Sequence, residues 1–356
     1  ISSWSYSGPV ARAYQLSRAP VAAIVGPTGG GKTTASCRRP VNIALWQHRS
    51  PRDGIRKARI VCVAPTYRDL WDKAIPSWKK VWPEDFGRGF KGSKGDPAEH
   101  IFDLNLSAPH GTTERRHIEM WVRAIREESL EEFVRGLEAT AFWFPEMDTH
   151  PAEDLLSLAG NRVPRYPEPD DRPDDPSLPP AYAGVYGDAN APVVGSWFHK
   201  RFYLAKRPAD RFFLQPSGFS PQHENAAALR KLHPNYYADL ASRMAEYDVG
   251  RLIRCNPGYS RNGKPVHEHF DHQRMVAPER IDADPLLELV IGADAGNTLS
   301  PAATFAQRSF DSQWRFLAEI HLAGRQMDMV EFGKEIRRVK DTRFPNVRRA
   351  VIYVDP

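Results

Sequence analysis

The segment with the clearest chemistry is a glycine-rich run, GPTGGGKT, at 26–33. It follows an apolar stretch that predicts a strand, and residues that predict a helix start come after it. This is the P-loop pattern, whose glycines let backbone N–H groups turn inward around a polyphosphate at a helix N-terminus. Lys32 would reach the β- and γ-phosphates and the Thr33 hydroxyl would ligate Mg²⁺, so the sequence predicts a site for ATP with Mg²⁺. The residues assigned to nucleotide contact are Gly26, Thr28, Gly29, Gly30, Gly31, Lys32, Thr33 and Thr34.

ATP hydrolysis also needs a group that activates water, and we expect it on a second strand beside the P-loop strand. Residues 140–144 (TAFWF) predict a buried strand that leads into Pro145 and Glu146. Glu146 would orient or deprotonate the attacking water. Pro145 stands where such sites usually have an Asp that supports Mg²⁺, so either Asp148 replaces it or Thr33 and waters suffice. The alternative is that Glu146 merely caps a strand.

Two further polar residues are candidates for the hydrolysis machinery. The sequence GDAN at 187–190 follows a predicted strand, and ligands bind at the carboxyl ends of such strands in open α/β sheets. We expect Asn190 to sense the γ-phosphate; the alternative is an Asx-turn. Arg135 lies before the Glu146 strand and is a candidate arginine finger for a neighbouring subunit's nucleotide, or else a solvated surface residue.

A second pair of carboxylates lies near the end of the chain. Asp294 and Asp355 each end an apolar stretch, and the elements from 286 onward follow the order βββαβ. A right-handed crossover would return the last strand beside and parallel to the first, which brings both carboxylates to one sheet end. Carboxylates that close repel unless a hard cation, Mg²⁺ or Mn²⁺, lies between them. The arrangement is ribonuclease H-like and suits two-metal phosphodiester cleavage; the alternative is that each Asp forms a turn.

The helix before the last strand is rich in cations, which would suit a phosphate backbone beside that metal site. A solvated helix face is the alternative, because Glu331 and Glu335 dilute the charge. The cations are Lys334, Arg337, Arg338, Lys340 and Arg343.

Composition limits the classes of protein that fit. The chain has 356 residues, 41% hydrophobic and 26% charged, which is the balance of a globular protein with two or three domains. No apolar run approaches the roughly 20 residues of a membrane span, so we expect no membrane partner. Three widely spaced cysteines argue against disulfides or a zinc site and favour a reducing cytoplasm. The net charge of +5 only mildly favours a polyanionic partner.

Short apolar strands that recur with helical or loop spacers predict an α/β fold with a mostly parallel sheet. Residues 101–106 and 118–122 alternate polar and apolar side chains and predict an antiparallel hairpin. The acidic, proline-rich segment 165–180 predicts an exposed loop. We predict a P-loop ATPase domain of the additional-strand type, followed by a ribonuclease H-like βββαβ nuclease domain that is incomplete at its C-terminal end. The expected limits are 1–255 for the ATPase domain, with a small subdomain at about 196–255, then 256–285 for a linker and 286–356 for the nuclease domain.

The order of these motifs resembles the large terminase subunit of tailed bacteriophages. One terminase branch has W-x-x-E in place of the Asp-Glu pair, and Trp143 to Glu146 is similar to it. The segments that carry the resemblance are GPTGGGKT at 26–33, the stretch 59–78, FWFPE at 142–146, GNRVPRYP at 160–167, GDANAP at 187–192, FLQPSG at 213–218, Tyr236-Tyr237 and GADAGNT at 292–298.

The resemblance implies a motor that hydrolyses ATP to move double-stranded DNA into a procapsid, and a nuclease that cleaves concatemeric DNA. It implies a small terminase subunit and a portal protein as partners, a homo-oligomeric ring on the portal, and the host bacterial cytoplasm as location. It also raises Asp294 and Asp355 to metal ligands and Arg135 to a trans-acting finger. The family's nuclease carries a third acidic ligand further on, so we expect the metal site to be incomplete where the sequence stops at Pro356.

Two other functions fit parts of the pattern. A helicase-like DNA translocase with a non-catalytic C-terminal DNA clamp would explain the nucleotide motifs and the basic helix, but it leaves the pairing of Asp294 with Asp355 accidental. A nucleotide-gated scaffold without hydrolysis is disfavoured by Glu146 and by the intact pair Lys32 and Thr33.

Overall fold

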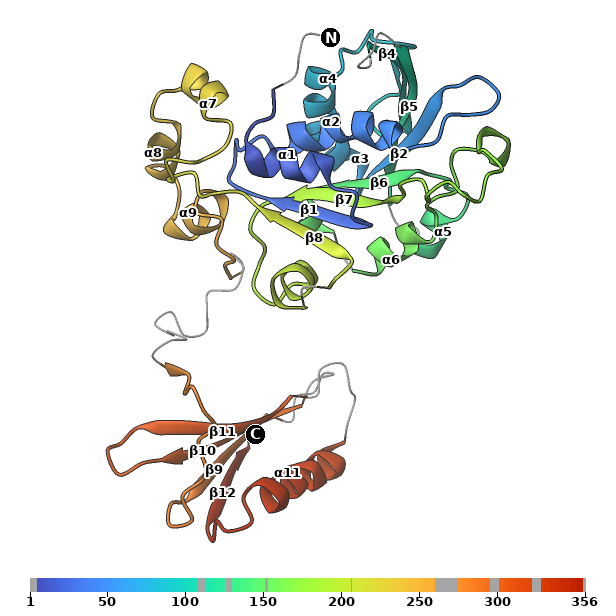
Figure 1. Ribbon diagram of the computed structural model, residues 1–356. Helices are drawn as coiled ribbons and strands as arrows, with labels where there is room; N and C mark the ends of the chain where they lie inside the picture. Colours follow the sequence, from blue (N-terminus) through green and yellow to red (C-terminus); the bar gives the residue numbers. More distant parts are fainter. Residues whose placement is uncertain are drawn as a thin grey trace. The chain divides into compact units, whose positions relative to one another are not determined.

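The computed structural model divides the chain into two compact units, Ile1–Pro265 and Val266–Pro356, which are described separately (Figure 1). The division falls inside the segment 256–285 that was predicted as a linker. The structure describes residues 5–107, 113–125, 130–150, 153–205, 207–259, 275–294, 301–321 and 328–354.

The first unit is built on an eight-stranded sheet with the order β3-β4-β5-β2-β6-β7-β1-β8. All neighbours from β5 to β8 are parallel, whereas β4 pairs antiparallel with both β3 and β5. The mostly parallel sheet and the β4–β5 hairpin confirm the sequence prediction. The strands are β1 (Val21–Val25), β2 (Arg56–Ala64), β3 (Phe90–Lys91), β4 (Ala98–Ser107), β5 (Thr113–Ala124), β6 (Ala141–Pro145), β7 (Gly184–Ala189) and β8 (Asp210–Leu214).

Helices cover both faces of this sheet (Figure 1). The α-helices are α1 (Pro9–Leu16), α2 (Lys32–Leu45), α3 (Tyr67–Asp69), α4 (Ile75–Val81), α5 (Leu130–Val134), α6 (Asp154–Gly160), α7 (Ala226–Leu232), α8 (Tyr236–Ala241) and α9 (Glu246–Leu252). Two π-helices, η1 (Leu70–Ala74) and η4 (His199–Ala205), and two 3₁₀ turns, η2 (Met147–Thr149) and η3 (Pro169–Asp171), complete the described elements.

The strands β1 and β6 consist of apolar residues because they are buried on both faces of the sheet. Successive side chains of a strand point to opposite faces, and β6 is buried at all five positions. Trp143 packs into the cluster under α1 and α2, where it stacks on Tyr186 with ring centroids 6.4 Å apart. Phe142 and Phe144 pack into the opposite cluster with residues of α6. The sheet is therefore a rigid platform whose carboxyl edge carries the candidate site.

The strand order corrects one expectation. Strand β6, which leads to Glu146, is not beside the P-loop strand β1, because β7 lies between them and pairs with both. Parallel neighbours need not be consecutive in sequence, so a strand later in the chain can insert between two earlier ones. Strand β7 places Asp188 opposite Ile24 of the P-loop strand.

The loop 165–180 is mostly exposed, as predicted, but it contains a few buried positions. Asp171, at the end of η3, is buried and accepts hydrogen bonds from Lys57 Nζ at 2.7 Å and from Ser50 Oγ at 2.8 Å. An acidic, proline-rich composition predicts solvent exposure on average, but one carboxylate with a lysine partner ties this loop to the start of β2.

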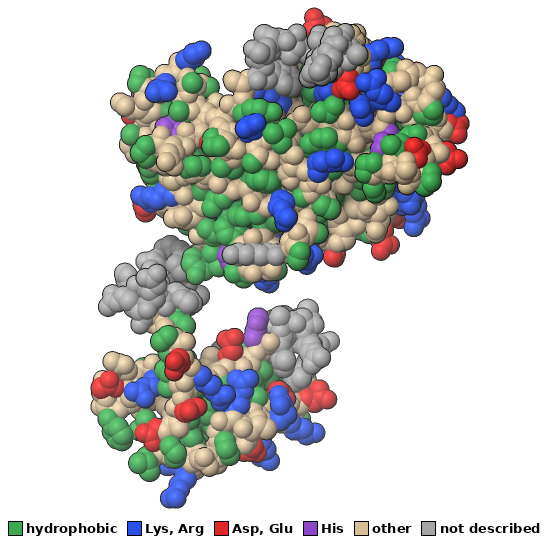
Figure 2. Space-filling model, viewed as in Figure 1, with side chains coloured by type: hydrophobic (Ala, Val, Ile, Leu, Met, Phe, Trp, Pro, Cys, Tyr) green, Lys and Arg blue, Asp and Glu red, His purple; other side chains and the backbone are tan. Residues whose placement is uncertain are grey.

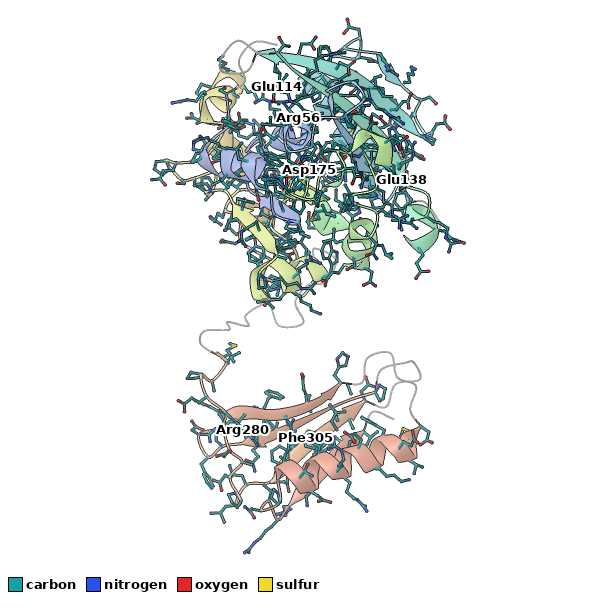
Figure 3. The ribbon with its side chains drawn as sticks, turned by 45° about the vertical axis from the view of Figure 1, so that its right-hand side comes forward. Arg56, Glu114, Glu138, Asp175, Arg280 and Phe305 are labelled. Carbon is teal, nitrogen blue, oxygen red and sulfur yellow. The ribbon has the colours of Figure 1, made fainter. Side chains whose placement is uncertain are left out.

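The second unit has a four-stranded sheet, order β11-β10-β9-β12, and one described α-helix, α11. Strand β12 runs parallel to β9, with Val354 opposite Ala293, which confirms the predicted βββαβ order and the return of the last strand. Phe305 lies between the sheet and α11, where it stacks on Phe344 at 5.6 Å (Figure 3). The elements are β9 (Leu289–Asp294), β10 (Ala302–Arg308), β11 (Trp314–His321), α11 (Met329–Arg343) and β12 (Ala350–Val354).

Of the helices that the structure describes, none combines the length and the apolar character needed to cross a lipid bilayer.

Candidate functional site

The nucleotide loop connects β1 to α2 as the sequence predicted, and its glycines are sterically required. Gly29 and Gly31 have φ of 79° and 80°, the left-handed region that side chains rarely adopt. A Cβ on Gly26 would lie 1.9 Å from Gln215 Oε1, and one on Gly31 would lie 2.4 Å from Ser7 Oγ. The backbone conformation of the loop thus depends on glycine at these positions.

Lys32 points back into the loop. Its Nζ donates to the carbonyl oxygens of Gly26 and Pro27 at 2.9 Å each, and to Asn190 Oδ1 at 3.2 Å. Burial lowers the pKa of Lys32, and the charge of Asp188 opposes that shift. The structure therefore brings together Lys32 and Asn190, two residues that are 158 positions apart in the sequence.

Asp188 is a candidate site residue that was not singled out from the sequence. Thr33 Oγ1 donates to Asp188 Oδ2 at 2.8 Å, and Trp143 Nε1 donates to Asp188 Oδ1 at 2.9 Å. The carboxylate is 3% exposed, and burial raises its pKa. Asp188, rather than Asp148, is the carboxylate hydrogen-bonded to the P-loop threonine. The motif GDAN contained the signal, but only the position of β7 beside β1 shows that its Asp meets Thr33.

The donor set around Thr33 fits Mg²⁺. A hydroxyl oxygen and a carboxylate oxygen are hard ligands, and Mg²⁺ at phosphate sites is usually bound through one or two such groups together with the substrate phosphates. Across the described part of the chain, no cluster of three or more His, Cys, Asp or Glu side chains could hold a metal ion on its own. A cation near Asp188 would also compensate a carboxylate that burial disfavours.

Asp148 has a different partner. It lies in η2, two residues after Glu146, and its Oδ2 is 3.7 Å from Arg251 Nη2 of α9. Burial raises the pKa of Asp148 to about 6, although Arg251 lowers it. Arg251 Nε also donates to the carbonyl oxygen of Ala191, next to Asn190, at 2.8 Å. The turn after Glu146, the end of β7 and α9 are thus linked through one arginine.

Glu146 follows β6 in an unusual conformation. Its φ of 47° is in the left-handed region, where a glutamate is uncommon and which functional sites often contain. Lys73 Nζ lies 2.5 Å from Glu146 Oε2 and 3.4 Å from Asp69 Oδ1. Partial burial lowers the pKa of Lys73, but the two carboxylates outweigh burial and the net pKa is raised. Lys73 was not singled out from the sequence, where no local pattern connects it with Glu146.

The outer side of the nucleotide loop is held by the segment after β8. Gln215 Nε2 donates to the Gly30 carbonyl at 2.9 Å and to Glu224 Oε2 at 2.7 Å. Asn225 Nδ2 donates to the Gly29 carbonyl at 2.8 Å. These side chains, to which the sequence assigned no role, hold two carbonyls of the loop in place. The loop N–H groups of Thr28 and Gly30 donate to the carbonyl oxygens of Leu252 at 2.8 Å and Pro27 at 3.0 Å.

The remaining predicted site residues lie elsewhere. Arg135 is exposed just after α5, and the nucleotide that a trans-acting finger would touch belongs to another subunit. Asp294 ends β9 at an exposed position. Asp355 lies outside the described residues. The last described pair on these two strands is Val354 and Ala293, the residues that immediately precede the two carboxylates.

The charges of the second unit are mixed. Figure 2 shows Lys and Arg side chains among Asp and Glu on the visible face. On α11, Arg338 pairs with Glu335 at 2.5 Å, and Lys340 pairs with the adjacent Asp341 at 3.1 Å. Part of the positive charge of this helix is therefore compensated locally.

The sequence matches no family model and no curated protein. Among solved structures, the chain is similar to the large terminase of a thermophilic bacteriophage, with 14% identity and a TM-score of 0.49 over 99% of this chain and 78% of that chain. It is also similar to the same terminase in complex with ADP, with 13% identity and a TM-score of 0.47 over 98% and 77% of the two chains. The ATPase domain of the large terminase from Thermus phage P74-26 has 10% identity and a TM-score of 0.39, over 70% of this chain and 92% of that chain.

At these identities and TM-scores, the likeness by itself establishes no activity for this chain. The family of the similar structures, the large terminases of thermophilic phages, is the family that the order of the sequence motifs resembles.

Proposed function

We propose that this chain is the ATPase subunit of a viral DNA-packaging motor. The main support for ATPase activity is the set of contacts between the nucleotide loop and the end of β7. Lys32 binds Asn190 and Thr33 binds Asp188. The order of motifs along the sequence supports the role in packaging, in which hydrolysis would drive double-stranded DNA into a procapsid.

The site residues would divide the work of hydrolysis. The loop N–H groups and Lys32 would bind the β- and γ-phosphates, the lysine exchanging the Gly26 and Pro27 carbonyls for phosphate oxygens. Thr33, with Asp188 behind it, would hold Mg²⁺, which neutralises phosphate charge when it is bound.

At the γ-phosphate side of the site, Glu146 would orient or deprotonate the attacking water. Asn190 accepts a hydrogen bond from Lys32. Binding of Lys32 to a γ-phosphate would alter this hydrogen bond, so Asn190 would respond to whether ATP or ADP is bound. In a homo-oligomeric ring on a portal protein, Arg135 would reach the nucleotide of the adjacent subunit.

We also propose that the second unit is part of a ribonuclease H-like nuclease that cleaves concatemeric DNA. The parallel pairing of β9 and β12 supports this role, because it brings Asp294 and Val354, the residue that precedes Asp355 in the sequence, to one sheet end. Asp294 and Asp355 would ligate Mg²⁺ or Mn²⁺ together with a further carboxylate. In this proposal the chain acts together with a small terminase subunit, in the cytoplasm of the host bacterium.

Steady-state ATP hydrolysis with and without double-stranded DNA tests the proposal. We expect Mg²⁺-dependent hydrolysis that DNA stimulates, and a loss of roughly 10²–10³-fold in kcat for Lys32→Ala, because the developing phosphate charge loses its cation. Full activity of Lys32→Ala would contradict the site. Strand separation of a forked duplex would instead favour the helicase-like translocase, since a packaging motor moves intact duplex.

A further inference from the structure

The side chain of Glu146 is flexible by itself and must be oriented by a neighbour. Its backbone turns sharply at the end of β6, and its side chain is 36% exposed. Within the described part of the chain, the hydrogen bond to this carboxylate comes from Lys73 Nζ, at 2.5 Å from Oε2. A long, partly exposed carboxylate samples several rotamers unless such a contact selects one.

Lys73 is itself held in place. It lies in the π-helix η1, which follows the carboxyl end of β2, and β2 is the parallel neighbour of β6. The Asp69 carboxylate lies 3.4 Å from Lys73 Nζ. Thr66 Oγ1 accepts from Asp69 N at 3.1 Å and donates to Asp69 Oδ2 at 2.6 Å. A chain of contacts therefore runs from Thr66 through Asp69 and Lys73 to Glu146, along one edge of the sheet.

The local helix geometry supports a functional reason for this arrangement. A π-helical turn is less stable than an α-helical one and is found frequently at functional sites. In η1 it occurs in the segment that presents Lys73 to Glu146. An ion pair with both partners this exposed contributes little to stability, so its stabilising effect does not account for the arrangement.

We propose that Lys73 is a positioning residue that orients Glu146 for ATP hydrolysis; this rests on the proposed role of Glu146 in activating water. The ammonium group of Lys73 lies between the carboxylates of Asp69 and Glu146. Its hydrogen bond to Glu146 involves one carboxylate oxygen, Oε2. Oε2 binds Lys73, and Oε1 is the oxygen that would face the attacking water. Lys73 need not touch the nucleotide for this role.

The test compares steady-state ATP hydrolysis by Lys73→Met with that of the wild-type chain. We expect kcat to fall about 10-fold with KM for ATP unchanged, because small losses of orientation at a reacting group cost this much or more while ground-state binding is untouched. Lys73→Arg should recover part of the loss, since it restores a cation within reach of Glu146. Asp69→Asn, which leaves Glu146 and Lys73 in place, should give a smaller fall in kcat.

A matched control lies next to the same segment. Lys94 Nζ pairs with Asp72 of η1 at 3.2 Å, and both side chains are exposed, 66% and 47%. Lys94→Met removes an exposed ion pair to η1 without contacting Glu146, so its kcat should equal that of the wild-type chain. If kcat fell equally in Lys73→Met and Lys94→Met, the loss would come from removing any surface charge that pairs with η1, and the proposal would be overturned.

A double-mutant cycle separates orientation from other effects. In a Glu146→Gln background, Lys73→Met should cause no further loss. A full additional 10-fold fall there would overturn the proposal, as would an unchanged kcat or a rise in KM alone for Lys73→Met. If the wild-type chain hydrolyses ATP and Glu146→Gln keeps full activity, the ATPase function stands and the role of Lys73 is refuted together with that of Glu146.

Discussion

At the scale of single residues, the central group of the candidate site is the carboxylate of Asp188, which reaches the P-loop from the neighbouring strand β7. Asp188 accepts a hydrogen bond from Thr33 and another from Trp143, and it is almost fully buried. The tryptophan holds one carboxylate oxygen in a fixed direction, so the other is presented to the threonine. This is the arrangement expected of a group that supports a metal ligand rather than one that caps a strand.

We predict that Asp188→Asn weakens the use of Mg²⁺ in hydrolysis by about 10- to 100-fold, the usual cost of losing a group that orients a metal ligand. The substitution keeps the shape and removes the charge, so more Mg²⁺ should be needed for half-maximal activity. A titration of ATPase activity against Mg²⁺ measures this shift.

The control for this prediction is Asp171→Asn, another buried aspartate whose partners are Ser50 and Lys57. It should lower the melting temperature without changing the Mg²⁺ requirement. If both variants keep the wild-type Mg²⁺ dependence, Asp188 has no part in metal binding.

At the scale of elements, Asp148 and Arg251 join η2 to α9. Arg251 also binds the carbonyl of Ala191, next to Asn190. A movement of α9 would therefore displace both the turn after Glu146 and the segment after β7. Asp148 is an unfavourable charge in this contact, since burial raises its pKa to about 6.

This shift predicts a pH dependence of stability. The ordinary pKa of an aspartate is about 3.9, so between about pH 4 and pH 6 the folded state binds a proton that the unfolded state has released. The free energy of unfolding should therefore decrease as pH rises through this range, by roughly 2–3 kcal/mol from this group. Asp148→Asn cannot lose a proton, so its stability relative to the wild-type chain should increase from pH 4 to pH 7.

Denaturant unfolding at several pH values measures that difference. The exposed Asp170 supplies the comparison, because Asp170→Asn should leave the pH dependence of the wild-type chain in place. A constant difference between Asp148→Asn and the wild-type chain from pH 4 to pH 7 would contradict the raised pKa.

At the scale of the whole molecule, the nucleotide site lies in one compact unit and Asp294 in the other. The two proposed activities should therefore be separable by mutation. Lys32→Ala should lower ATP hydrolysis by roughly 10²–10³-fold and spare metal-dependent DNA cleavage. Asp294→Ala should do the reverse, because it removes an oxygen ligand of the proposed metal site.

Parallel assays of ATP hydrolysis and plasmid cleavage on both variants check this separation, with Glu279→Ala in the second unit as a control that should retain both activities. Loss of both activities in either single variant would contradict two independent sites.

The sequence by itself determined what is local or contiguous. The nucleotide loop was predictable because strand, loop and helix follow one another, so the spacing of Gly26, Lys32 and Thr33 reports their geometry directly. The parallel return of β12 beside β9 was also predictable, because the handedness of crossovers leaves few alternatives for a βββαβ order.

Tertiary structure alone decided the contacts between distant segments. The insertion of β7 between β1 and β6 placed Asp188 rather than Asp148 against Thr33, and the pairing of β2 with β6 placed Lys73 beside Glu146. Strand order depends on which buried faces pack best over the whole sheet, and no local pattern in the sequence encodes that choice. The P-loop could therefore be predicted from its sequence motif, whereas its contacts with Asp188 and Asn190 depend on which strands become neighbours.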